Sequence, residues 1–515
     1  MAERIFPMPV PEGMKMMKTL TRPLFFVPGV LVIAFLYRLA IPYFYPAALR
    51  ADEIFQALEP AHRLLTGHGV TTWEWQAGIR NWAFPDLIAG IWHVTDVLGL
   101  GHSPLWIQGV ICALSLGIVV AFMGLGRIVA GRCGLVVCAL TGALWPDLVL
   151  GASRTTTEVL GGNLLALGTI MAMIARLLSQ DGHIMSPGRA TDGKVSCLYT
   201  GGAFFIGCGA GLRFQLMPAA LLALAWMAWW CRRTPGWVMF MALGFALPVL
   251  GYGLVDLGTT GMVFGSVLRN VHANIGQNIA ATYGTAPFYF YIVDLLLRWQ
   301  VGFLVVAAFF AYGCRQFPMP SMVAVTVILS HSLIGHKEPS FIYGAIPLVL
   351  VVATVTFSNW VNQDPIPWPG RRIMLGAVMI PLLGFVQVQS LTHMRTSNAL
   401  IRLQQIAAAQ ADICGLALPI RGEWSHTGGY SYFSRHDVPL YFADDVASLT
   451  ALDGRYNYLV TYGKTWSAPP EDTAIACRRE FCLFRIRPQC SMPPDYAQFA
   501  QAVNRYEART HAVHD

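Results

Sequence analysis

The sequence predicts an all-α polytopic membrane protein with about eleven transmembrane helices, interfacial helices in its first outer loop and a small α/β exterior domain at its C-terminal end. Three observations support this prediction. Hydrophobic residues make up 55% of the 515 positions and charged residues only 12%, which is about half the charged fraction of an average soluble protein. The apolar residues gather in runs that are long enough to cross a bilayer. The last part of the chain, after residue 392, is much more polar and contains four cysteines.

The charge of the chain excludes one class of partner. The net charge is +7, and the basic residues lie in short clusters between apolar runs, where the positive-inside rule places them. No segment combines a basic stripe with aromatic residues that stack on bases. We therefore expect membrane lipid, and no nucleic acid, as a partner.

The first apolar run, from Leu24 to Phe44, predicts a spanning helix rather than a cleavable signal peptide. It is longer than the core of a typical signal peptide, and no small-residue cleavage site ends it. Lys15, Lys18 and Arg22 precede it and hold its start in the cytoplasm. Together with the later apolar runs, the expected spans are 23–44, 104–126, 133–150, 159–178, 198–212, 217–231, 236–257, 291–313, 319–335, 341–358 and 373–391.

The stretch 83–99 is also hydrophobic, but it contains Asp86, His93 and Asp96, which are costly at the centre of a bilayer. We therefore interpret it as an interfacial helix. Counting it as a span would invert every later connection and break the positive-inside rule repeatedly. With 83–99 at the interface, the cytoplasmic connections carry Arg127, Arg132, Arg176, Arg189, Lys194, Arg232, Arg233, Arg315, Arg371 and Arg372.

This orientation divides the chain into a transmembrane catalytic domain, 1–391, and a soluble exterior domain, 392–515. Four cysteines in a soluble tail suit an oxidising compartment. The sequence does not fix their pairing, and unpaired structural cysteines are the alternative. The exterior segments are 45–103, 151–158, 213–216, 258–290, 336–340 and the tail, whose cysteines are Cys414, Cys477, Cys482 and Cys490.

Two adjacent carboxylates, Asp52 and Glu53, follow the first span directly, at the point where an amphipathic helix begins. Asp52 fits a helix N-cap, because its side-chain oxygen can accept a hydrogen bond from an unpaired helix N–H. A carboxylate at the membrane surface also fits a general base that activates a hydroxyl nucleophile. The spacing does not choose between these two roles.

Later in the same loop, Trp73, Glu74 and Trp75 form a polar and aromatic cluster, and Arg80 follows it. Tryptophans at a bilayer interface usually serve as anchors. The same cluster also suits sugar recognition, because aromatic faces stack on pyranose rings while polar groups bind hydroxyls. Tyr283 opens another aromatic segment, 283–291, which an interfacial aromatic belt explains equally well.

Several basic residues are expected on the exterior side of the membrane, although the positive-inside rule favours the cytoplasmic side for such residues. Arg154 and Arg213 suit either pairing with an acid or bidentate binding of a phosphate. A very short connection between two expected spans contains His336, Lys337 and Glu338. Ionisable residues so close to the hydrocarbon region of the bilayer indicate a function. We expect Lys337 to face a phosphate with Glu338 as its partner; a local ion pair that fixes the helix ends is the alternative.

Together these motifs place carboxylates, cations and aromatic rings on one face of the membrane. Transfer of a sugar from a lipid phosphate to a hydroxyl needs these parts, because a base deprotonates the acceptor while cations stabilise the departing phosphate. A flippase of lipid-linked saccharides is the alternative, but a transporter should show inverted repeats and ionisable residues at the membrane midplane. The sequence shows neither feature, which favours an enzyme.

The motifs also resemble the first luminal loop and later loops of the glycosyltransferase family 22 mannosyltransferases, GT-C-fold enzymes of GPI-anchor and N-glycan precursor assembly. The resemblance runs in order over residues 45–350 and includes no part of the tail. The family's His-Pro-Asp-Glu is Arg50-Ala51-Asp52-Glu53 here, and Ser340 stands in place of an arginine in its last motif. The matching segments are Asp52-Glu53 through Gln56, Glu59-Pro60 and His62, Thr72-Trp73-Glu74-Trp75 and Arg80, Arg154-Thr155 with Glu158, Tyr283-Gly284 with Pro287, and His336-Lys337-Glu338 with Phe341-Ile342.

The resemblance implies a GT-C-type fold and inverting transfer of mannose, or a related sugar, from a polyprenyl-phosphate donor to a lipid-linked or protein glycan. It implies Asp52 as the base, and no metal or cofactor beyond the lipid-phosphate sugar as co-substrate. We expect the active site and tail on the periplasmic side of a bacterial inner membrane, or on the luminal side of an ER membrane. The expected site comprises Asp52 and Glu53 as catalytic residues, Arg154, Arg213, His336 and Lys337 at the donor phosphate, and Glu59, His62, Trp73, Glu74, Trp75, Arg80, Tyr283 and Glu338 at the sugar or acceptor.

Overall fold

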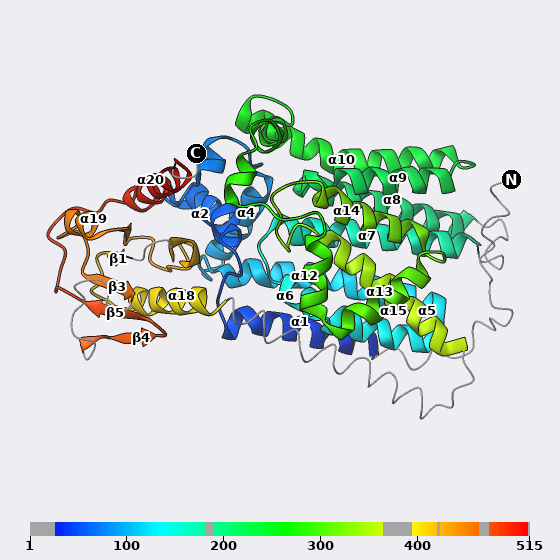
Figure 1. The fold of residues 1–515 in the computed structure, drawn as a ribbon, viewed down its shortest axis with the longest axis horizontal. Coiled ribbons are helices and arrows are strands. Elements are labelled where there is room, and N and C mark those ends of the chain that lie inside the picture. The colour runs from blue at the N-terminus through cyan, green and yellow to red at the C-terminus, as the bar shows by residue number, and fades with distance from the viewer. Residues whose placement is uncertain (1–25, 181–188, 364–393, 420–422, 463–472, 513–515) are drawn as a thin grey trace.

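A computed structural model describes residues 26–180, 189–363, 394–419, 423–462 and 473–512. A bundle of apolar helices forms one end of the molecule, a small sheet forms the other, and α2 and α4 lie between them (Figure 1). The expected span 373–391 and the expected cytoplasmic charges Arg371 and Arg372 lie outside the described residues, as do Lys15, Lys18 and Arg22.

Six helices in the described part of the chain are long and apolar enough to cross a membrane, and a bent pair makes a seventh if it is one span. The six are Phe26–Phe44, Pro104–Leu144, Thr157–Gln180, Gly193–Leu212, Pro235–Thr260 and Tyr343–Asn362. The bundle helices are α1 (Phe26–Phe44), α5 (Pro104–Leu144), α6 (Pro146–Gly151), α7 (Thr157–Gln180), α8 (Arg189–Leu212), α9 (Met217–Trp230), α10 (Pro235–Thr260), α12 (Phe290–Trp299), α13 (Val301–Gly313), α14 (Pro318–Ser332) and α15 (Ile346–Gln363).

Helix α5 contains the expected span 104–126 and most of the expected span 133–150, whose last residues lie in α6. Its backbone leaves the helical conformation at Ala130 and at Gly131, where φ is 60°. A Cβ atom on Gly142 would meet Val119 and Phe122 at 3.3–3.4 Å, although a straight helix would separate residues 119 and 142 by about 34 Å. The chain therefore doubles back at Gly131, and the two halves of α5 are antiparallel.

Three expected spans differ from the structure. The expected span 291–313 is broken at Gln300 into α12 and α13, which meet at 119°. Helices α9 and α14, expected as 217–231 and 319–335, have only 14 and 15 residues. Both are shorter than the roughly 20 residues that span a bilayer without help from flanking segments. Hydropathy detects apolar composition, but it does not detect where an apolar run changes direction.

The first outer loop forms short helices, as expected. Helix α4 (Ala83–Val97) has 15 residues and is too short to span. It buries Phe84, Ile88 and Trp92 and exposes Asp86, His93 and Asp96, which is the two-faced pattern of an interfacial helix. The other elements of this loop are the π-helical η2 (Ile54–Leu58), α2 (Glu59–Thr66) and α3 (Trp73–Gln76), and a later outer segment forms α11 (Gly265–Val271), η4 (His272–Gly276) and η5 (Ile279–Tyr283).

The C-terminal unit contains a five-stranded sheet in the order β2-β1-β3-β5-β4. Strand β1 pairs parallel with β2 and β3, and β5 pairs antiparallel with β3 and β4. Its elements are α18 (Arg395–Ala408), β1 (Leu416–Leu418), η7 (Glu423–His426), β2 (Leu440–Phe442), α19 (Val446–Ala451), β3 (Tyr458–Tyr462), β4 (Ala476–Arg478), β5 (Phe481–Arg485) and α20 (Gln498–Ala512).

All four tail cysteines are paired. Cys414 bonds to Cys490 over a sequence separation of 76 residues, and Cys477 bonds to Cys482 across the β4–β5 hairpin. The alternative of unpaired structural cysteines is therefore wrong, and the pairing is what an oxidising compartment permits.

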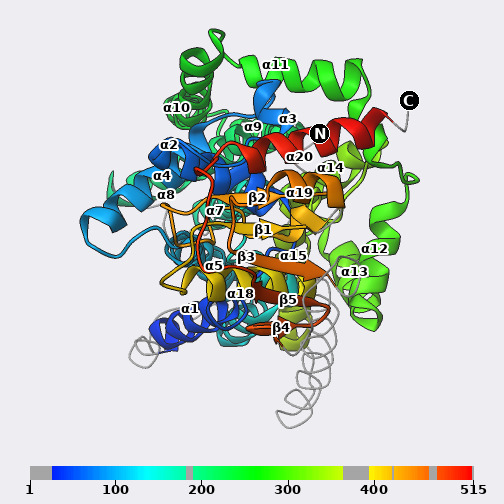
Figure 2. The same ribbon diagram turned by 90° about the vertical axis from the view of Figure 1, so that its left-hand side faces the viewer.

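The C-terminal unit is packed against the first outer loop. One hydrophobic core contains Phe55 and Trp92 from the loop together with Trp424, Phe433 and Phe499 from the C-terminal unit. Helix α20 consequently runs beside the outer helices α3 and α11 at the end of the bundle (Figure 2). This arrangement brings the C-terminal unit to the polar end of the helical bundle.

Candidate active site between two cavities

Asp52 lies at the centre of the polar end of the bundle. It lies two residues before Ile54, the first residue of η2, and a π-helical turn of this kind is frequent at functional sites. Within the described part of the chain, the Asp52 side chain makes no hydrogen bond, so it does not cap the helix that follows. Burial raises the pKa of Asp52 to about 7, with further upward contributions from Glu74 and Glu158 that outweigh the opposing effect of Arg80.

Two cavities meet at Asp52. The first has a volume of about 430 Å³ and lies between α4, α8, α10 and α11, with a mostly apolar lining. The second has a volume of about 420 Å³ and lies between α3, η5, the 336–341 segment and the C-terminal unit. Both cavities are lined by Asp52, Gln56, Arg80, Arg213, Phe214, Gln215 and Asn270.

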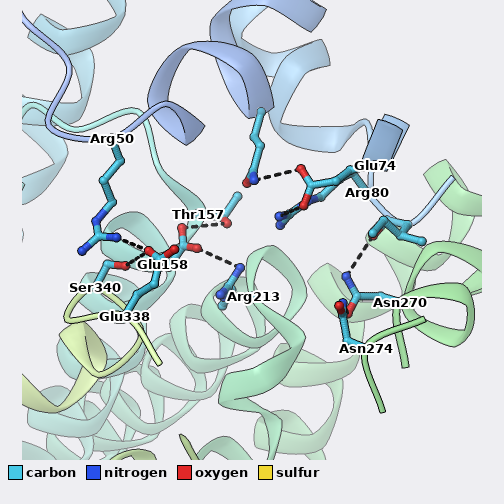
Figure 3. Close-up of polar contacts among 12 residues, drawn as sticks. Arg50, Glu74, Arg80, Thr157, Glu158, Arg213, Asn270, Asn274, Glu338 and Ser340 are labelled. Carbon is cyan, nitrogen blue, oxygen red and sulfur yellow. Dashed lines mark hydrogen bonds and ion pairs between the residues drawn. The ribbon is translucent and has the colours of Figure 1, made fainter. Parts of the chain in front are cut away.

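Arg80 is held at this junction by Glu74. The Arg80 Nη2 atom lies 2.6 Å from Glu74 Oε1, and Gln56 Nε2 donates to Glu74 Oε2 at 2.9 Å (Figure 3). The Nε atom of Arg80 is buried and has no hydrogen-bond partner among the described residues. Arg80 therefore keeps an N–H available for a bound group.

Arg213 occupies the opposite side of the same junction, directly after α8. Its Nη1 atom lies 2.8 Å from Glu158 Oε1, and its guanidinium lies 5.2 Å from the ring centre of Phe341. Its Nε atom is also buried without a partner in the described part of the chain. Two guanidinium groups with unpaired N–H donors suit an anionic oxygen, and such donors bind phosphate bidentately.

The 336–341 segment closes the second cavity, but its ion pairs differ from the expectation. Glu338 pairs with Arg50 (Figure 3) and lies 3.6 Å from His336. Lys337 instead donates to the backbone carbonyl of Ala286 at 2.8 Å and to that of Ile334. The expected Lys337–Glu338 partnership is therefore wrong. Lys337 is also absent from the described lining of both cavities.

Protonation in this segment is set by the same contacts. The hydrogen bond to Glu338 raises the pKa of His336. Burial disfavours the Glu338 anion, but His336 and Arg50 outweigh it and hold the Glu338 pKa below its usual value. The segment therefore presents a paired, ionised carboxylate at the rim of the second cavity.

The expected aromatic residues divide between the two cavities. Trp73 donates from its indole N–H to the Tyr283 hydroxyl at 2.7 Å, and both residues line the second cavity. Trp75 is buried, donates to the Phe55 carbonyl at 3.1 Å and lines the first cavity. Aromatic side chains thus flank Asp52 on both sides.

Besides Lys337, four expected site residues lie away from both cavities. Glu53 accepts from the Leu49 N–H at 2.7 Å and pairs with Arg154 at 3.2 Å, and both side chains are almost fully buried. This buried pair joins the start of the first loop to the turn before α7. The other two residues are Glu59 and His62.

Glu59 and His62 connect the first loop to the C-terminal unit. Glu59 accepts from the N–H groups of Val70 at 2.9 Å and Ser431 at 2.7 Å, and burial nevertheless raises its pKa to about 7. The His62 Nε2 atom lies 3.0 Å from the Nδ1 atom of His436. Although His62 and His436 are neighbours, no group of three or more His, Cys, Asp or Glu residues in the described part of the chain is arranged to hold a metal ion.

Sequence reasoning did not identify several residues that line the second cavity. Trp424, Ser425 and Glu507 belong to the C-terminal unit, which matched no known motif. Arg50 and Glu158 are close in the sequence to expected site residues. Their ion pairs with Glu338 and Arg213 connect them to the site, and the sequence does not show these pairs. Arg50 pairs with Glu338, which is 288 positions away in the sequence.

Comparisons with known proteins identify relatives of this chain. The sequence profile of the Alg9-like mannosyltransferase family matches residues 30–434. GPI mannosyltransferase 3 of Yarrowia lipolytica is 27% identical over 336 residues, which are 63% of this chain and 61% of that protein. GPI mannosyltransferase 3 of Eremothecium gossypii is 25% identical over 490 residues, which are 80% of this chain and 79% of that protein.

The fold is also similar to a solved structure. The crystal structure of ArnT from Cupriavidus metallidurans bound to undecaprenyl phosphate superposes with a TM-score of 0.53, covering 91% of this chain and 98% of that chain. The sequence identity is 14%, so this likeness concerns the fold alone. It confirms the predicted GT-C-type architecture of helical bundle and small C-terminal sheet.

Proposed function

The chain belongs to the Alg9-like mannosyltransferase family, and we propose that it transfers mannose from a polyprenyl-phosphate carrier to a hydroxyl of a lipid-linked or protein glycan, with Asp52 as the base. One observation carries this proposal: a carboxylate without a hydrogen-bond partner in the described structure lies where two cavities meet, between two arginines. The names of the fungal relatives support mannose as the sugar.

We assign the donor to the first cavity and the acceptor to the second. The surface that lines the first cavity is mostly apolar, which suits an isoprenoid chain, and Arg80 and Arg213 also border this cavity. The second cavity is lined by Trp73, Glu74 and Tyr283 and is open to the C-terminal unit, which suits a polyhydroxylated acceptor. Asp52 borders both cavities.

The proposed reaction is a single displacement. Asp52 takes the proton of the acceptor hydroxyl, whose oxygen forms a bond to C1 of mannose on the face opposite the phosphate. The bond from C1 to the phosphate oxygen breaks, and polyprenyl phosphate leaves with the electron pair. The N–H donors of Arg80 and Arg213 stabilise the charge that develops on the phosphate. Inversion at C1 follows from this geometry.

The proposed location is the exterior or luminal side of a bacterial inner membrane or an ER membrane. The two disulfides of the C-terminal unit support an oxidising compartment. Cysteine labelling at positions 336–340 from outside intact cells or vesicles tests the orientation. Reactivity from the cytoplasmic side alone would contradict it.

Replacing Asp52 by Asn tests the base. Because general-base catalysis contributes about 10²–10⁴-fold, the D52N variant should lose at least about 10²-fold in kcat with polyprenyl-phosphate mannose, while donor binding persists. Asp86→Asn is the matched control, since Asp86 is exposed on α4 and lines neither cavity. Wild-type turnover by purified D52N would refute the assignment.

A further inference from the structure

The wall of the second cavity includes one residue of α20, a helix that the family profile does not cover. The profile ends at residue 434, whereas α20 begins at Gln498. Glu507 of α20 lines the second cavity together with Trp424 and Ser425. Figure 2 shows α20 running across the end of the bundle toward α14, beside α3.

Glu507 differs from most of the acidic residues that line this cavity, because no arginine, lysine or histidine in the described structure forms an ion pair with it. Glu74 pairs with Arg80, Glu158 with Arg213, and Glu338 with Arg50. In the part of the chain that the structure describes, the two remaining lining acids, Asp52 and Glu507, have no ion pair. Asp52 is the proposed base, so Glu507 is the one lining acid without an assigned role.

The carboxyl group of Glu507 is only half satisfied. It accepts a hydrogen bond from the backbone N–H of Trp73, and its Oε2 atom is buried without a partner among the described residues. Buried polar atoms in proteins are nearly always hydrogen-bonded, and an unsatisfied one destabilises the folded protein. Glu507 therefore has an acceptor position that a ligand hydroxyl would fill.

Glu507 and Asp52 face the same aromatic side chain. The charges of Glu507, Glu74 and Asp52 all act on the Tyr283 hydroxyl and oppose its ionisation, after the larger effect of burial. Tyr283 also accepts the indole N–H of Trp73, the residue whose backbone donates to Glu507. Asp52, Tyr283 and Glu507 line the same cavity, so a sugar bound there has both carboxyl groups in its wall.

We propose that Glu507 is an acceptor-binding residue, whose carboxyl group binds a hydroxyl of the acceptor sugar and thereby positions another hydroxyl of that ring against Asp52. The proposal rests on the proposed mannosyl transfer. It makes the C-terminal unit part of the acceptor site, so the choice of acceptor depends on a segment outside the family profile. The ligand class is a polyhydroxylated sugar, with Trp424 and Ser425 completing the wall.

The test is steady-state transfer by purified full-length protein in detergent, with polyprenyl-phosphate mannose as donor and octyl α-mannoside as acceptor. Glu507→Gln and Glu507→Ala should raise the acceptor KM by about 10-fold or more, the usual cost of losing a hydrogen bond to a charged group, and leave the donor KM within about 2-fold. Glu480→Gln, which changes an exposed acid of the β4–β5 turn, is the matched control and should change neither KM.

Monodeoxy derivatives of octyl α-mannoside sharpen the test. For the wild-type protein, the acceptor that lacks the ring hydroxyl bound by Glu507 should have a lower kcat/KM than octyl α-mannoside. The factor should equal the loss that E507A shows with octyl α-mannoside. E507A should use this deoxy acceptor and octyl α-mannoside with the same kcat/KM. Equal losses in wild type and E507A for every deoxy acceptor would overturn the proposal. A variant with lower kcat and unchanged acceptor KM would also overturn it, since that pattern indicates a general structural role.

Failure of this proposal is distinguishable from failure of the proposed function. If wild type transfers mannose and D52N does not, the function stands whatever Glu507 does. If wild type transfers mannose, D52N is inactive and E507Q and E507A keep the wild-type acceptor KM, then Glu507 alone is misassigned. Absence of transfer by wild type to every mannoside tested would instead reject the mannosyl-transfer reaction and, with it, this proposal.

Discussion

At the scale of single residues, the site separates charged groups that act on a ligand from those that hold the chain together. Asp52, Arg80 and Arg213 border cavities and keep unsatisfied hydrogen-bonding capacity. Glu53 and Arg154 satisfy each other away from the cavities. Residues of the same chemical type therefore differ in their surroundings, and a position beside a cavity distinguishes them.

The pH dependence of transfer should report on Asp52. Its pKa of about 7 means that the proton-accepting anion is lost as pH falls through 7, so kcat/KM should fall about 10-fold per pH unit below that value. Glu74→Gln removes a neighbouring negative charge and should move this acidic limb to lower pH. A pH–rate profile of both proteins checks the shift, and an unmoved limb in E74Q would contradict the proposed electrostatics.

The Glu53–Arg154 pair should be structural. Replacing Arg154 by Met leaves a buried carboxylate unpaired and should destabilise the protein by about 3–5 kcal/mol. The double variant Arg154→Met with Glu53→Gln removes both charges and should recover most of that loss. Thermal unfolding of the purified proteins measures both effects. If R154M raised the donor KM without a loss of stability, the expected donor-binding role of Arg154 would be supported instead.

At the scale of elements, the sequence predicted the type and order of most helices. Apolar runs identified α1, both halves of α5, α7, α8, α10 and α15, and charge content identified α4 as a non-spanning helix. The break at Gln300 was not predictable from composition, because its backbone adopts a φ of 47° within an otherwise apolar run. Hydropathy averages over a window and does not register a single change of direction.

The candidate site was predictable where its residues form local motifs. Asp52, Trp73, Glu74, Arg80 and Tyr283 all line the second cavity, as the motifs indicated. Contacts between distant segments were not predictable from one sequence. Glu59 pairs with the backbone of Ser431, 372 positions later, and no local pattern distinguishes that structural role from sugar binding. For the same reason, Glu507 carried no signal.

The contact of α2 with the C-terminal unit should be sensitive to acid. Burial lowers the pKa of His62 to about 3, well below its usual 6.5. His436, His68 and His102 add to this effect, whereas Asp96 and Asp437 raise the pKa of the neighbouring His436. Between these two values the unfolded chain binds a proton on His62 that the folded protein does not bind. The contribution of His62 to the free energy of unfolding should therefore fall as pH drops from about 6.5 toward 3.

The size of this acid effect can be stated. One such group contributes up to about 1.4 kcal/mol per pH unit within that interval. His62→Gln should flatten the dependence of the unfolding temperature between pH 6.5 and 5. His426→Gln is the matched control, because His426 is exposed on η7. An H62Q variant that is as acid-sensitive as wild type would show that other groups dominate.

At the scale of the whole molecule, the C-terminal unit forms one wall of the second cavity, so its stability should affect transfer. The Cys414–Cys490 bond closes a segment of 76 residues and the Cys477–Cys482 bond closes one of only 5. Loop-closure entropy gives stabilisations of about 4 and 2 kcal/mol, respectively. Loss of the Cys414–Cys490 disulfide, which closes the longer segment, should therefore perturb the acceptor site more than loss of the Cys477–Cys482 disulfide.

Paired serine substitutions test this expectation. Cys414→Ser with Cys490→Ser should lower the unfolding temperature more than Cys477→Ser with Cys482→Ser, and it should raise the acceptor KM more than the donor KM. Calorimetry and steady-state kinetics give the two readouts. Equal changes in both KM values would indicate that the C-terminal unit does not contribute selectively to the acceptor cavity.

The contact between Glu59 and Ser431 has a consequence for biosynthesis. The two residues are 372 positions apart, so at about 5–20 residues per second the ribosome needs roughly 20–70 s between them. During that interval the apolar face of the first loop that contains Phe55 and Trp92 lacks its partner. Until the C-terminal unit has been made, this apolar face of the nascent chain is unpaired and prone to aggregation, and the second cavity is complete only after the C-terminal unit has docked.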